Sequence, residues 1–64
     1  MMMEAIEFIH SVYADEYYFH GEPDQITNEE AAFTINEWKA EGFDVPDMVT
    51  PELFAAVWNL YCKM

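Results

Sequence analysis

The sequence predicts an all-α fold, a compact three-helix domain with short connections. Apolar residues recur at steps of three and four in three segments, which is the spacing of amphipathic helices. Two of these segments are preceded by helix-start residues, and glycine and proline separate all three. No segment alternates with the period of two that is typical of strands. A length of 64 residues is enough for one domain, and we expect residues 1–64 to form one.

The first predicted helix runs from about Met3 to Tyr18. Helical spacing is shared by a stripe of apolar residues that we expect to face inward: Ile6, Ile9, Tyr13 and Tyr17, with Ala5 and Val12 beside it. The glycine and proline that follow, Gly21 and Pro23, predict a turn after this helix.

The second helix is predicted over Asn28 to Glu41. Thr27 and Glu30 fit a capping box, in which each side chain bonds the backbone amide of the other residue. The expected inward stripe is Ala31, Ile35 and Trp38. Gly42 supplies the left-handed residue that commonly ends a helix.

The third helix is predicted to begin after Thr50, with Pro51 in its first position and Glu52 in its first turn. A broad apolar face follows: Leu53, Phe54, Val57, Leu60, Tyr61 and Met64, with Trp58 beside it. Because this segment has almost no charged side, we expect it to lie at the centre of the core.

Charge is the most unusual property of the chain. Thirteen Asp and Glu residues stand against two Lys, which gives a net charge of −11. Every acidic residue precedes Leu53. Such a field repels nucleic acid and anionic membrane surfaces but attracts a basic protein surface. We therefore expect a basic protein partner, with no direct nucleic-acid binding and no membrane binding.

The same sequence offers little chemistry for catalysis. Cys62 is the one cysteine, so an intrachain disulfide is excluded and a reducing, cytoplasmic location is expected. No base stands near Cys62 in sequence, and no glycine-rich phosphate loop is present. His20, Glu22 and Asp24 are close in sequence but do not have the spacing of known metal motifs. We expect neither an enzyme nor a bound cofactor or metal.

The acidic residues lie among aromatic rings, most densely in the stretch DEYYFHGEPD at residues 15–24. Like charges one helical turn apart, as at Glu37 and Glu41, destabilise a helix, so a sequence that keeps them is expected to use them. Charge would steer the partner, and buried rings would hold it. The predicted partner-binding residues are Asp15, Glu16, Tyr18, Phe19, Glu22, Asp24, Glu29, Glu30, Glu37 and Glu41.

In size, charge and aromatic content, residues 1–52 resemble the small acidic inhibitors, many of them encoded by bacteriophages, that imitate DNA. The resemblance implies a protein that occupies the nucleic-acid site of a host enzyme or nucleoid protein, inside the cytoplasm of that host. It rests on no shared motif, so it assigns no residue a role. The alternative is an interaction module, including a homodimer, that uses an exposed aromatic patch, with the acidic residues serving solubility alone.

Overall fold

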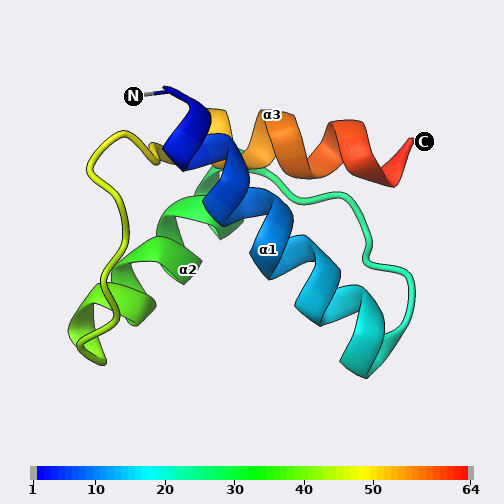
Figure 1. Cartoon of the computed structure of the whole chain (residues 1–64), viewed down its shortest axis with the longest axis horizontal. Coiled ribbons are helices and arrows are strands. Elements are labelled where there is room, and N and C mark those ends of the chain that lie inside the picture. The colour runs from blue at the N-terminus through cyan, green and yellow to red at the C-terminus, as the bar shows by residue number, and fades with distance from the viewer. Residues whose placement is uncertain (1, 64) are drawn as a thin grey trace.

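The computed structural model describes residues 2–63 and contains three α-helices: α1 (Met2–His20), α2 (Asn28–Ala40) and α3 (Pro51–Cys62). No strand occurs within these residues. The predicted all-α, three-helix fold is therefore confirmed. In Figure 1, α1 crosses α3 near its own beginning, and α1 and α2 then run apart toward the lower edge of the view.

The boundaries of α2 follow from its predicted caps. The Thr27 amide donates to the Glu30 carboxylate at 2.9 Å, and the Glu30 amide donates to the Thr27 hydroxyl at 3.1 Å. At the other end Gly42 has a φ of 92°. Its amide donates to the Lys39 carbonyl at 3.1 Å, and the Phe43 amide donates to the Trp38 carbonyl at 2.9 Å. This pair of bonds is a Schellman motif, which requires the left-handed conformation that glycine adopts readily.

The predicted start of α3 is also confirmed. The Thr50 hydroxyl accepts a hydrogen bond of 3.1 Å from the Leu53 amide, and Pro51 occupies the first position of the helix. The first helix extends two residues beyond its expected end, to His20, and stops at Gly21.

Helix α3 is the centre of the molecule, as its apolar sequence predicts. Both α1 and α2 pack on it, whereas within the described residues no Cα of α1 lies within 8 Å of a Cα of α2. Residues from all three helices and from the second connector form the buried core: Ala5, Ile9, Ala31, Ile35, Val45, Val49, Phe54, Ala55 and Trp58. Trp58, which the sequence places beside the apolar face, lies within this core.

The inward stripe predicted for α1 is partly wrong. Ile9 is fully buried and Tyr13 packs against the core, as expected, whereas Ile6 and Tyr17 are exposed. Ala5, expected beside the stripe, is fully buried, and its small side chain is compatible with close packing of α1. Leu60 of α3, also predicted to be apolar and inward, is exposed as well.

Three side chains of α3 hold the connector between α1 and α2 in place. The Trp58 indole donates to the Asp24 carbonyl at 2.9 Å, and the Cys62 thiol donates to the Pro23 carbonyl at 3.4 Å. Asn59 bonds both backbone polar groups of Ile26. The connector is thereby fastened to the helix on which α1 and α2 both pack.

None of the helices is both long enough and apolar enough to cross a membrane, within the residues that the structure describes.

Candidate partner-binding surface

All thirteen acidic side chains are exposed to solvent. One of them, Glu30, accepts a hydrogen bond in the capping box of α2. Within residues 2–63, no other carboxylate side chain forms a hydrogen bond or an ion pair that holds the fold together. The fold thus leaves nearly all of its negative charge free to meet solvent or a partner.

The predicted partner-binding residues fall into two groups on the structure. Six of them belong to the end of α1 and the connector after it: Asp15, Glu16, Tyr18, Phe19, Glu22 and Asp24. The other four belong to the first turn and the end of α2: Glu29, Glu30, Glu37 and Glu41. Because the ends of α1 and α2 point apart (Figure 1), the ten residues do not form one compact cluster.

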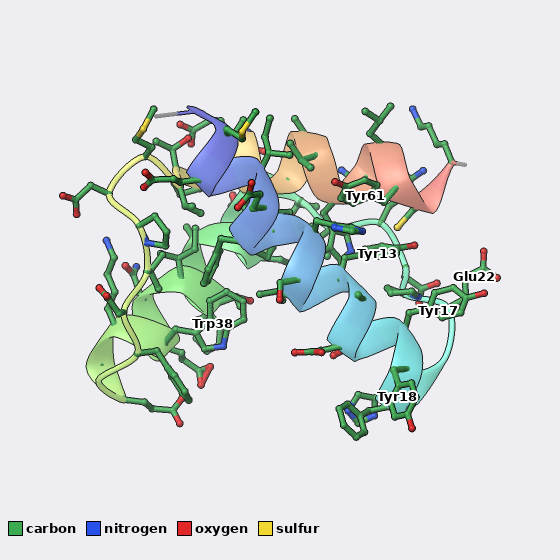
Figure 2. The ribbon with its side chains drawn as sticks, in the orientation of Figure 1. Tyr13, Tyr17, Tyr18, Glu22, Trp38 and Tyr61 are labelled. Carbon is green, nitrogen blue, oxygen red and sulfur yellow. The ribbon has the colours of Figure 1, made fainter. Side chains whose placement is uncertain are left out.

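A groove of about 440 Å³ lies between these two helix ends. We call it the α1/α2 groove. It is lined by Phe8, Ser11, Val12, Asp15, Glu16, Phe19 and His20 of α1, by Trp38 of α2, and by Phe43 and Asp44 after α2. Figure 2 shows the Trp38 ring in the opening between the two helices. Aromatic rings and carboxylates therefore line the same hollow.

The groove exists because α1 and α2 do not pack against each other along their backbones. Phe8 and Trp38 bridge them, with ring centroids 5.9 Å apart and planes at 80°. A smaller hollow of about 210 Å³ shares Val12, Glu16 and Trp38 with the groove. Glu16 lines both hollows and is nevertheless exposed, so its carboxylate lies in a partly apolar setting on the side of α1 that faces α2.

The predicted rings of the site are the most exposed large hydrophobic side chains among the described residues of α1. Tyr18 is 82% exposed and Phe19 is 71% exposed, and their rings meet edge to face with centroids 5.0 Å apart. By contrast, Tyr13 and Trp38 pack against the core, as their helical spacing predicts.

Besides Tyr17, which was expected to face inward and is exposed, sequence reasoning missed two other exposed rings. Phe33 of α2 is 66% exposed, and Phe43, just after α2, is 63% exposed. Phe33 lies on the helix face opposite Ala31 and Ile35, one turn from both Glu29 and Glu37, so helical spacing alone could have identified it. Phe43 could not be found in this way, because its exposure depends on the direction that the chain takes after Gly42.

The environment of Tyr13 perturbs its titration. Partial burial raises the pKa of Tyr13 above its ordinary value of 10.0, and the neighbouring Cys62 side chain raises it further. The Tyr13 ring also meets Trp58 at 4.9 Å and Tyr61 at 5.2 Å between centroids. Figure 2 shows Tyr13 beside Tyr61, away from the α1/α2 groove. This environment marks a structural role for Tyr13.

No group of three or more His, Cys, Asp or Glu side chains in the described part of the chain is arranged to hold a metal ion. His20, Glu22 and Asp24, which are close in sequence, form no such group. Cys62 is half-buried on α3, where its thiol bonds the connector.

Comparison with known proteins finds no matching family model, no matching curated protein and no matching solved structure. Any functional argument for this chain therefore rests on its own charges, rings and grooves.

Proposed function

We propose that this protein is a non-enzymatic inhibitor or regulator that binds a basic protein surface, and that this surface is one that otherwise binds nucleic acid. The negative charge of the protein would take the place of the phosphate backbone. Binding of this kind removes the partner from its nucleic acid and needs no catalytic group.

The observation that carries the proposal is that the fold makes almost no use of its own carboxylates. Exposed acidic residues cost stability through mutual repulsion in a small domain that has little stability to spare. Glu37 and Glu41 are one turn apart, and the last turn of a helix is the place where negative charge is least favourable. A protein that carries this cost is expected to gain binding from it.

The exposed rings support the same proposal. Tyr18, Phe19 and Phe33 stand among carboxylates on the surface rather than in the core. Charge pairs at the rim of an interface mainly raise the association rate, whereas buried aromatic side chains supply much of the affinity. The surface has both components.

The proposal is tested by affinity capture from the source cells with the immobilised protein, at low and at high salt, with and without added duplex DNA. We expect basic nucleic-acid-binding proteins to be retained at low salt, to be released by high salt, and to be released by DNA at constant salt. Release by salt but not by DNA would contradict imitation of nucleic acid.

Two matched variants locate the charge that matters. Glu30→Gln, Glu37→Gln and Glu41→Gln together should weaken capture strongly. The control, Glu4→Gln, Glu7→Gln and Glu52→Gln, removes the same charge elsewhere and should weaken it much less. Equal loss in both would show that net charge alone governs the binding.

A second candidate function is self-association through exposed apolar side chains of α1 or α3. Ile6 of α1 and Leu60 of α3 are both exposed, and no acidic residue follows Glu52 along α3. Two copies could meet on α3 without bringing carboxylates of that helix together. Light scattering across a range of concentrations tests this, and Leu60→Gln should abolish any dimer that uses this face.

A further inference from the structure

We infer that the α1/α2 groove receives an arginine side chain from the basic surface of the partner. This inference rests on the proposed function and adds to it the place and the chemistry of the central contact. It begins from the composition of the groove, in which four aromatic rings and three carboxylates surround one opening.

The lining of the groove matches the two parts of an arginine side chain. Phe8, Val12 and Trp38 offer an apolar surface to its aliphatic stem. Phe19 and Phe43 are largely exposed and are free to pack against the planar guanidinium. Arginine stacks on aromatic rings more readily than lysine does, because its charge is spread over a plane and is less strongly hydrated.

The acidic residues of the groove complete the match. Asp15 and Glu16 come from α1, and Asp44 comes from the chain that follows α2, so carboxylates approach the opening from both sides. No lysine lines the groove, and the one basic residue there is His20. A guanidinium can donate to carboxylates in a fork, whereas an ammonium acts as a point charge.

Within residues 2–63, no side chain is bonded to these carboxylates. The carboxylates of Asp15, Glu16 and Asp44 make no hydrogen bond or ion pair within residues 2–63. The net charge of −11 favours a cation over an apolar or acidic guest. A basic segment that presents arginine therefore fits the groove better than an apolar helix would.

The test is an NMR titration of the isotope-labelled protein with hexa-arginine and, separately, with hexa-lysine. The salt is about 50 mM NaCl, at which surface charges are weakly screened. The probe of position is the indole N–H resonance of Trp38, which lines the groove. The internal control is the indole N–H of Trp58, which is buried and bonded to Asp24. We expect hexa-arginine to shift the Trp38 resonance and leave that of Trp58 in place, and to bind more tightly than hexa-lysine.

Two pairs of variants distinguish binding in the α1/α2 groove from attraction by the overall negative charge. We expect hexa-arginine binding to weaken by roughly tenfold or more in the groove variant Asp15→Asn, Glu16→Gln and Asp44→Asn. The control variant Glu4→Gln, Glu7→Gln and Glu52→Gln loses the same charge and should change binding by about twofold. Phe19→Ala should weaken binding without altering charge, and Phe33→Ala, an equally exposed ring outside the groove, should not.

The outcomes distinguish this inference from the proposed function. Binding of hexa-arginine with an unmoved Trp38 resonance, or equal losses in the two acidic sets, would overturn the arginine site and leave the proposed function standing. Equal affinity for the two peptides would overturn the preference for arginine. Absence of binding to both peptides would count against the site and the proposed function together. Circular dichroism of each variant shows that the fold is retained, as expected for exposed positions.

Discussion

The side chain of Asn59 pairs with the backbone of Ile26, 33 positions earlier in the chain. Its Oδ1 accepts from the Ile26 amide at 2.8 Å, and its Nδ2 donates to the Ile26 carbonyl at 2.8 Å. This pair of hydrogen bonds fixes the position of Ile26, the residue before the N-cap of α2. It thereby sets where α2 begins relative to α3.

Replacement of Asn59 by alanine should lower the free energy of unfolding by about 2 kcal/mol, because both polar groups of Ile26 lose their partner in a half-buried place. Urea unfolding followed by circular dichroism measures the change. Asn36→Ala is the control, since Asn36 is exposed on α2 and forms no side-chain hydrogen bond within the described residues. A loss for Asn59→Ala no larger than the loss for Asn36→Ala would contradict the structural role.

Replacement of Thr27 by alanine should cost about 1 kcal/mol, because the Glu30 amide loses its acceptor at the start of α2. Thr34→Ala is a useful contrast. The Thr34 hydroxyl donates to the Glu30 carbonyl within the helix, at 2.9 Å, so its removal frees no orphan amide. We expect thermal unfolding to show a clear drop for Thr27→Ala and a smaller change of either sign for Thr34→Ala.

Neutralisation of Glu37 or Glu41 should stabilise the protein while it weakens partner binding. Each glutamine variant relieves repulsion across one turn at the end of α2, worth about 0.3 kcal/mol, and the gain should shrink as salt is added. The midpoint of thermal unfolding at low and high salt measures the stability of each variant. Affinity capture of the partner measures its binding. If the variants lose stability and binding together, the loss of binding would reflect damage to the fold and would not support a binding role for the charge.

The environment of Tyr13 predicts a loss of stability in alkaline solution. Its pKa is raised by partial burial and by the neighbouring Cys62 side chain, so the folded state holds the phenolic proton more tightly than the unfolded state does. The stability gained in this way is fully present below the ordinary pKa and is lost as pH rises through the folded pKa. The expected window therefore opens at about pH 10.

Urea unfolding of the protein and of Tyr13→Phe, from about pH 8 to about pH 11, tests this prediction. The difference in stability between them should move in favour of the phenylalanine variant as pH rises through that window. Tyr18→Phe is the control, because Tyr18 is an exposed ring on the surface of α1. Parallel curves for Tyr13→Phe and the parent would show that Tyr13 titrates alike in both states.

Much of the fold could be predicted because its signals are local. The capping box of Thr27 and Glu30, the Thr50–Pro51 start and the glycine at position 42 each act within one turn of helix, and all three are confirmed. The buried line of α1 could not be predicted in the same way. Ala5 and Ile6 are both apolar, and the choice between them depends on how α1 approaches α3 in space.

The candidate site shows the same division. Exposure of Tyr18 and Phe19 agrees with their position off the apolar stripe. The groove is different, because it joins residues of α1 with Trp38, Phe43 and Asp44, and no local pattern tells how far apart two helices diverge. Val45 and Val49 lie in the connector after α2, outside any helix, yet both are buried in the core.

The absence of close packing between α1 and α2 has a consequence for any guest that enters between them. Helices α1 and α2 are connected through their packing on α3 and have no close backbone contact with each other. A small increase in the angle between α1 and α2 would therefore separate few side chains. The α1/α2 groove could thus bind side chains of different width at a small cost in free energy, without any opening of the core on α3.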